Sequence, residues 1–384
     1  MESFILFDYA TLRFIWWLLL GALLVFFALT DGFDLGIAAL LPLVAKTDNE
    51  RRVVINVVGP VWEGNQVWLI TAGGAIFAAW PLLYAASFSG FYLAMLLVLV
   101  ALILRPVGFK YRSKIKTSIW RSSWDAILCF SGFVAALVFG VAMGNVILGV
   151  PLGFDSISLR IIYEGNFFQL FRPFALLAGL LSVFMLTMHG ASFLTIKTEG
   201  SIQERSRSYG IACSILTFSL FVIGGFWLKN LDGHVIVNNL DHNIFSNPFL
   251  KMVEVTKGAW LLNYEKVPVT CLAPIFGISG AFLAFLGFVK RNYRVSFLGS
   301  SLSISGIIIS VGVSLFPFLL PSSLGDSSGG LTVWDASSSH LTLWIMSIVV
   351  VIFLPIVLAY TSWVYRVLRG IVTEESVKEN PNSY

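Results

Sequence analysis

The chain of 384 residues is 57% hydrophobic and only 12% charged, and its mean hydropathy is +0.85. An ordinary soluble domain is excluded, because about a quarter of the residues in such domains are charged. The net charge of +4 is small and gives no sign of a nucleic-acid partner. The cysteines Cys129, Cys213 and Cys271 are far apart and form no CxxC pair. We therefore expect them to be small packing residues rather than a metal or redox site.

Nine apolar stretches are long enough to cross a bilayer as helices, which takes about 20 residues. They cover residues 14–44, 53–80, 82–104, 124–148, 171–196, 208–230, 267–289, 295–320 and 340–366. The sequence therefore predicts an all-α membrane protein with nine transmembrane helices, in one integral membrane domain over residues 1–384.

Basic residues are concentrated on one side of these predicted spans. The connections after spans one, three, five and seven, with the end of the chain from Arg366 onward, carry 18 of the 25 lysines and arginines. Six of these lie between Arg105 and Arg121. Because cytoplasmic loops are enriched in Lys and Arg, we expect a cytoplasmic tail and, with an odd number of spans, an outer N-terminus. The longest outer loop is then 231–266.

Residues 60–69 (PVWEGNQVWL) bring polar side chains into the second predicted span. Glu63 is a carboxylic acid, and Asn65 and Gln66 are carboxamides. Acids at membrane depth are energetically costly and mark functional sites. Pro60 is expected to loosen the helix.

Two further acids, Asp31 and Asp34, lie in the first predicted span, and their i, i+3 spacing puts both on one helix face. Asp34 lies 11 residues before the first inner loop and Glu63 lies 11 residues after it. At ~1.5 Å per residue both would be about 16 Å from the inner surface. We expect Asp34 and Glu63 at one level, facing each other.

Two interpretations of this polar group remain open. Crowded buried carboxylates cannot all ionise cheaply, so the acids with Asn65 and Gln66 could form a protonatable chain for proton entry. Alternatively, the same groups form a structural network that joins helices. Asp125 lies beside basic residues at the start of span four, and we expect a solvated acid at a helix end.

The four histidines, His189, His234, His242 and His340, give no paired ligands inside the membrane. Only His189 lies within a span, whereas haem held between helices normally has facing His or Met ligands. We expect His189 to be hydrogen-bonded structure, with no haem or metal bound by this chain. Most of the 12 tryptophans lie near span ends, as in an aromatic belt. Trp62 and Trp68 lie deeper, where packing competes with the lining of a route for a small neutral molecule.

Several blocks of the sequence resemble subunit II of cytochrome bd ubiquinol oxidases. They are residues 13–17 (RFIWW), 30–36 (TDGFDLG), 60–75 (PVWEGNQVWLITAGGA), 105–114 (RPVGFKYRSK), 165–170 (GNFFQL) and 331–339 (LTVWDASSS). The similarity runs from about residue 8 to the tail and so covers nearly the whole chain.

This resemblance implies a fold of two four-helix bundles plus one peripheral helix, in the inner membrane of a bacterium. It implies a partner, subunit I, with two b-type haems, one d-type haem and the quinol-oxidising loop. Subunit II would be free of haem and have no catalytic residue of its own. Quinol is oxidised at the outer side and dioxygen is reduced to water with cytoplasmic protons. Small single-span subunits and a structural quinone occur in the family, and the sequence names no contacts for either.

The resemblance also assigns roles to individual residues. The family's proton-path acid at the subunit interface matches Glu63, where the family often has Asp. An oxygen-access route begins near the aromatic that matches Trp68, and Asp31 and Asp34 match an acidic pair of the first helix. The competing hypotheses are a proton-coupled secondary transporter and a passive assembly scaffold.

Overall fold

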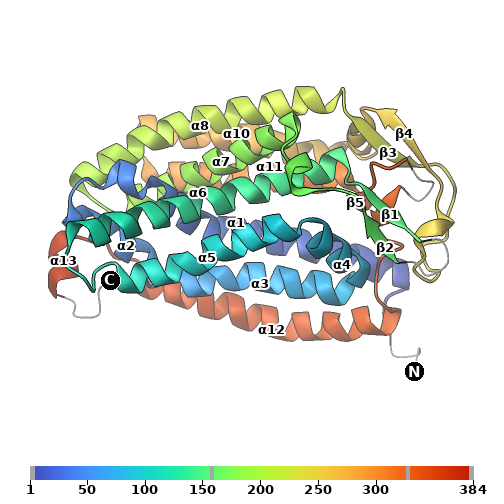
Figure 1. Cartoon of the computed structure of the whole chain (residues 1–384), viewed down its shortest axis with the longest axis horizontal. Helices are drawn as coiled ribbons and strands as arrows, with labels where there is room; N and C mark the ends of the chain where they lie inside the picture. The colour runs from blue at the N-terminus through green and yellow to red at the C-terminus, as the bar shows by residue number, and fades with distance from the viewer. Residues whose placement is uncertain (1–4, 156–159, 326–328, 380–384) are drawn as a thin grey trace.

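The computed structural model describes residues 5–155, 160–325 and 329–379. The start of the chain, parts of two expected outer loops and the last five residues of the expected tail lie outside this range. Long helices run side by side and small β-hairpins gather at one end (Figure 1). The long helices are α1 (Tyr9–Val44), α3 (Trp62–Ala79), α5 (Tyr92–Tyr111), α6 (Ser118–Leu148), α7 (Pro173–Lys197), α8 (Gly200–Leu228), α10 (Leu272–Val289), α11 (Tyr293–Leu315) and α12 (His340–Val367). Shorter helices are α2 (Asp48–Val58), α4 (Pro81–Gly90), α9 (Leu262–Lys266) and α13 (Glu374–Glu379), with 3-10 turns η2 (Phe167–Leu170), η3 (Pro248–Leu250), η4 (Ala259–Leu261) and η5 (Pro268–Cys271).

Eight helices in the described part of the chain are long and apolar enough to cross a membrane: α1, α5, α6, α7, α8, α10 with η5, α11 and α12. The protein is therefore a multi-pass membrane protein. Helix α3 is not among the eight, although it packs along α1. This 18-residue helix carries Glu63, Asn65 and Gln66 among its first five residues, and these polar residues lower its hydropathy.

Two of the predicted spans are broken in the structure. The expected span 53–80 consists of α2 and α3, which are separated at residues 59–61. Pro60 causes this break because it lacks an N–H and restricts the residue before it. The expected span 82–104 consists of α4 and α5, which meet at Phe91. Helix α5 also continues to Tyr111, so Arg105 lies inside a helix and not in the expected inner loop.

The end of the bundle opposite α2 carries three two-stranded antiparallel sheets, which the all-α expectation missed. They pair β1 (Leu152–Phe154) with β2 (Ile161–Tyr163), β3 (Asp232–Ile236) with β4 (Val253–Lys257), and β5 (Phe318–Pro321) with β6 (Gly330–Thr332). The strands are only three to five residues long, which explains why hydropathy, a signal averaged over about 20 residues, did not reveal them. We call this the strand end, and the other the tail end.

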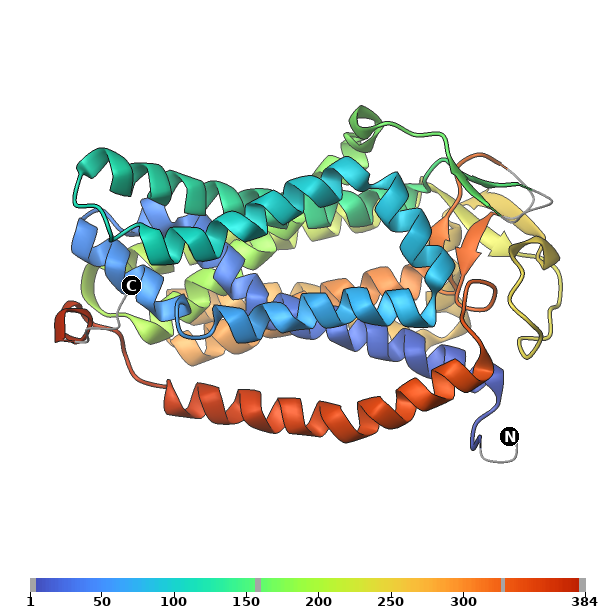
Figure 2. The same cartoon turned by 60° about the horizontal axis from the view of Figure 1, so that its bottom comes forward.

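Helix α1 is the centre of the bundle and packs against α3, α6, α7 and α11. Its closest approach is to α7. A Cβ added at Gly36 would lie 2.0 Å from the backbone oxygen of Leu186, and one at Gly190 would lie 2.7 Å from the backbone carbon of Gly36. Small residues at such crossings let membrane helices approach closely. By contrast, only Leu343 of α12 is buried, and Figure 2 shows α12 along the outside of the bundle.

At the tail end, α2 begins with a capping box. The Glu50 backbone N–H donates to the Thr47 hydroxyl, and the Glu50 carboxylate accepts the Lys46 and Thr47 backbone N–H groups at 2.6 and 3.1 Å. Ser201 and Arg205 of α8 bind the same carboxylate. Burial opposes ionisation of Glu50, but these hydrogen bonds outweigh it and lower the pKa from 4.5 to about 2.

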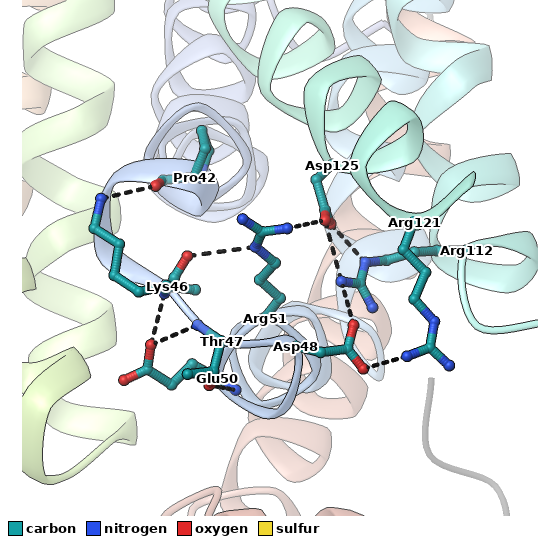
Figure 3. Close-up of polar contacts among 10 residues, drawn as sticks. Pro42, Lys46, Thr47, Asp48, Glu50, Arg51, Arg112, Arg121 and Asp125 are labelled. Atoms are coloured by element: carbon teal, nitrogen blue, oxygen red, sulfur yellow. Dashed lines mark hydrogen bonds and ion pairs between the residues drawn. The ribbon is translucent and has the colours of Figure 1, made fainter. Parts of the chain in front are cut away.

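Asp125 is buried at the tail end rather than solvated as the sequence suggested (Figure 3). Its carboxylate accepts hydrogen bonds from Arg112 at 2.5 and 3.1 Å and from Arg51 at 2.8 Å. Asp48 binds Arg112 at 2.9 Å and Arg121 at 2.7 Å. These contacts join the start of α6 to α2 and to the end of α5.

The expected tail is partly folded. Helix α13 packs against α2, and Val377 is buried there. Asn49 donates to Glu374 at 3.2 Å, and the Val372 N–H donates to the Lys197 backbone oxygen at 2.9 Å. The described part of the tail therefore closes over the tail end of the bundle.

Gly36→Ala should lower the free energy of unfolding by about 1–3 kcal/mol, the usual cost of overpacking, because the added methyl would meet the α7 backbone. The measurement is thermal unfolding of the detergent-solubilised protein. Gly21→Ala on the same helix is the control, since an added Cβ there meets nothing within 4 Å. Equal melting temperatures for the two variants would contradict the close crossing.

The stabilisation that Glu50 provides should depend on pH between about 4.5 and 2. Because the folded-state pKa is the lower one, the contribution is complete above pH 4.5 and is lost as the pH falls toward 2. Unfolding measured across this range should show a fall for the wild type that Glu50→Gln lacks. Ser201→Ala removes one donor and should move the loss to higher pH. A wild type and Glu50→Gln that respond alike would refute this assignment.

Candidate functional site

A buried ion pair joins α1 to α5 inside the bundle. The Asp31 carboxylate lies 2.6 Å from Arg105 Nη2, and both side chains are completely buried. The pair depends on the continuation of α5 through Pro106 to Tyr111, which places Arg105 against α1. Arg105 could not be recognised from the sequence, because the Arg-Pro step and the basic residues after it are typical of a helix end.

One helical turn along α1, Asp34 begins a chain of hydrogen bonds. Asn65 of α3 donates from Nδ2 to Asp34 Oδ2 at 2.8 Å. The hydroxyl of Tyr365, in the last turn of α12, donates to Asn65 Oδ1 at 2.6 Å. Asp34 and Asn65 are buried. The sequence gave no signal for Tyr365, because a tyrosine near a span end is ordinarily explained by the aromatic belt.

Only one of the two carboxylates, Asp31, is paired with a cation. Arg105 contacts Asp31, whereas the only described hydrogen-bond partner of Asp34 is the neutral amide of Asn65. Within the described residues, Asp31 Oδ2, Asp34 Oδ1 and two nitrogens of Arg105 have no hydrogen-bond partner. Buried polar atoms of this kind are normally satisfied, often by ordered water. The cluster can therefore form further hydrogen bonds to water, and its carboxylates can bind one proton.

Glu63 does not face Asp34 as the sequence predicted. It lies on the exposed side of α3, and Asn65 occupies the place opposite Asp34. Asp34 lies 10 residues from the end of α1 at Val44, which is ~15 Å along the helix. No hydrogen bond or ion pair joins Glu63 to any described residue. The prediction failed because it assigned a depth but no helix face.

Gln66, Trp68 and Thr30 lie outside this cluster of hydrogen bonds. Gln66 is partly exposed and makes no hydrogen bond with the described residues. Trp68 is buried and stacks on Phe26 with ring centroids 4.9 Å apart. The Thr30 hydroxyl donates to the Phe26 backbone oxygen at 2.8 Å, within its own helix.

His189 of α7 is buried and both ring nitrogens have partners. Nδ1 lies 2.8 Å from the Ser300 hydroxyl, and Nε2 lies 3.0 Å from the Leu29 backbone oxygen. The ring also stacks on Phe297, with centroids 4.9 Å apart. The prediction that His189 is hydrogen-bonded is confirmed. Across the described ranges, no group of three or more His, Cys, Asp or Glu residues is arranged to hold a metal ion.

The cluster brings groups that can exchange hydrogen bonds together inside the bundle. Its parts come from α5, α1, α3 and α12, and the carboxylates, the amide and the phenol can all exchange hydrogen bonds. Glu63 forms a separate acid on the outward side of the same helix as Asn65.

Comparison with known proteins gives a consistent result across the chain. The family described as cytochrome bd terminal oxidase subunit II matches residues 12–368. The chain is 48% identical to the probable cytochrome oxidase subunit 2 of Haemophilus influenzae and 46% identical to the cytochrome bd-I ubiquinol oxidase subunit 2 of Escherichia coli K12. Both matches cover 98% of this chain and 99% of the relative.

More distant proteins are similar to this chain over nearly its whole length as well. The chain is 30% identical to the cytochrome bd ubiquinol oxidase subunit 2 of Bacillus subtilis, over 95% of this chain and 98% of that protein. The fold is similar to a chain of the bd oxidase from Geobacillus thermodenitrificans, with a TM-score of 0.68 at 15% identity. That likeness covers 93% of this chain and 98% of the other.

Arg105→Gln should lower the free energy of unfolding by about 3–5 kcal/mol, because it leaves the buried Asp31 carboxylate without its cation. The double variant Asp31→Asn with Arg105→Gln removes both charges and should be more stable than Arg105→Gln alone. Chemical unfolding of the detergent-solubilised variants measures both. Additive losses in the double variant would show that the two side chains are not energetically coupled.

Proposed function

The chain belongs to the cytochrome bd terminal oxidase subunit II family, and we propose that it is the haem-free subunit of a quinol:oxygen oxidoreductase in a bacterial inner membrane. It would support a haem-bearing subunit I and conduct protons from the cytoplasm to the site that reduces dioxygen to water. The E. coli relative is by name a ubiquinol oxidase subunit. This membership favours the oxidase over the transporter alternative.

The observation that carries the proposal is the outward position of Glu63. A carboxyl group at membrane depth is costly when it faces lipid, and within the described part of the chain nothing pairs with it. A second protein against the exposed face of α3 would cover it. Val67, Ile70 and Phe77 are exposed along the same face, and Cβ atoms added at Gly64, Gly73 and Gly74 would meet nothing within 4 Å. We assign this face, with the outer side of α12, to subunit I.

Protons would then reach the partner through Glu63. The buried Asp34 cluster would hold a proton close to this path. Asp34 lacks a cation of its own, so a proton on Asp34 leaves the cluster neutral with Asp31 bound to Arg105. Tyr365 and Asn65 extend this cluster toward the end of α12. Gln66 stands on the same turn of α3 as Glu63. We propose that water links Glu63, Gln66 and the Asp34 cluster.

The proposal includes nine membrane passes, with α3 as the ninth, arranged as two four-helix bundles plus one peripheral helix. The tail end would be cytoplasmic and the strand end outside, as the positive-inside rule indicates. Both ring nitrogens of His189 are engaged in hydrogen bonds, which supports placing the two b-type haems and the d-type haem in the partner. Quinol oxidation and any small single-span subunits are also assigned outside this chain, and no contacts are assigned to a structural quinone.

We also propose that Trp68 lies at the start of an access route for oxygen. It lies in an apolar cluster with Phe27, Val98 and Leu102, next to the exposed Val67 of the proposed subunit face. Oxygen is apolar and would enter such a region from the bilayer. The stacking on Phe26 means that a route would pass around the indole and not through it.

Glu63→Gln should slow quinol-dependent oxygen uptake of the assembled oxidase about tenfold or more, which corresponds to ~1.4 kcal/mol in the barrier. Asp34→Asn should slow it in the same direction. The measurement uses the complex with its partner subunit, with haem content determined from the visible spectrum. Glu63→Asp keeps the carboxylate and is the matched control. Unchanged turnover in Glu63→Gln with full haem content would leave this chain as a scaffold.

A further inference from the structure

A groove runs along the side of the bundle between α1 and α6, away from the Asp31 cluster. Its volume is about 560 Å³, within the ~300–1,000 Å³ of typical ligand sites. Its lining residues are Ala39, Pro42, Leu43, Arg51, Ser122, Asp125, Ala126, Cys129, Phe130 and Phe133. Apolar side chains therefore line its length, while the polar ones gather where α6 begins.

The position of the polar residues identifies the orientation of a ligand. Arg51 extends from α2 toward Asp125 of α6, with Pro42 of α1 nearby (Figure 3). From Asp125 to Phe133 the groove follows eight residues of α6, which is ~12 Å. Half of the ~30 Å hydrocarbon core of a bilayer is about 15 Å. The groove thus matches one leaflet in length, with its polar mouth at the tail end.

The mouth carries excess positive charge. Its bonded network contains Arg51, Arg112 and Arg121 against the two carboxylates of Asp48 and Asp125. Both oxygens of Asp125 are already bound by arginines. The Arg51 side chain, which lines the groove, stays 25% exposed.

We propose that this groove binds one anionic phospholipid from the leaflet at the tail end. The phosphate would rest on Arg51 with the Ser122 hydroxyl beside it, and an acyl chain would lie over Ala126, Cys129 and Phe130. A neutral quinone would use the apolar length of the groove but would leave the excess cations uncompensated. The charge at the mouth therefore favours a phosphate-bearing ligand over a quinone.

Photo-cross-linking tests the occupant directly. Phe130 is replaced by p-benzoylphenylalanine in the assembled oxidase, which is placed in nanodiscs of equal phosphatidylglycerol and phosphatidylcholine with added ubiquinone. Mass spectrometry of the labelled peptide then identifies the attached molecule. We expect phosphatidylglycerol adducts to exceed phosphatidylcholine adducts several-fold. Arg51→Gln should bring the ratio toward one.

A filling variant provides the second readout. Ala126→Phe places a ring in the groove from an exposed position on α6 and should abolish retention of phosphatidylglycerol in native mass spectra. Ser123→Phe adds the same ring to an exposed neighbour that does not line the groove, and should leave retention unchanged. If the two lipids form adducts in the same ratio as in the nanodisc, the groove contacts lipid without selectivity and the proposal is wrong. A dominant ubiquinone adduct, or equal retention in the two phenylalanine variants, would also overturn the proposal.

Discussion

The ion pair between Asp31 and Arg105 is the interaction on which the interior of this protein depends. Two full charges 2.6 Å apart are completely buried among apolar helices, where an isolated charge would be prohibitively costly. The pair fixes α5 against α1 at one register, since neither side chain can withdraw without leaving the other uncompensated. It also leaves Asp34, one turn away, as the acid without a cation. The chemistry proposed for the chain begins with that imbalance.

Helix α3 has one side in the interior of the bundle and the other on its surface. Asn65 faces inward and bonds both Asp34 and Tyr365, whereas Glu63, two residues earlier, faces outward. Residues two apart lie on different sides of a helix, so the same polar turn serves the interior of this chain and its surface. This geometry suits a subunit that hands protons to a neighbour. A self-contained active site would have brought both side chains inward.

The sequence correctly predicted a multi-pass membrane protein, but the expected spans 53–80 and 82–104 are each broken into two helices. Averaged hydropathy and the 3.6-residue period carry that information over many residues. It could not predict which face Glu63 takes, because α3 has almost no polar–apolar asymmetry outside its first turns. Arg105 and Tyr365 were missed because each lies where basic and aromatic residues are normal near a span end. The β-hairpins depend on pairing between distant segments, such as β3 with β4, which local patterns do not encode.

The low hydropathy of α3 also bears on how the chain enters the membrane. Its first turns carry Glu63, Asn65 and Gln66, and such residues disfavour insertion of an isolated helix. Helix α1 precedes it in synthesis and presents Asp34 as a partner for Asn65. Insertion of α3 is therefore favourable as a pair with α1 rather than alone. The hydrogen bond that serves the polar cluster in the mature protein would be a condition for its assembly during biosynthesis.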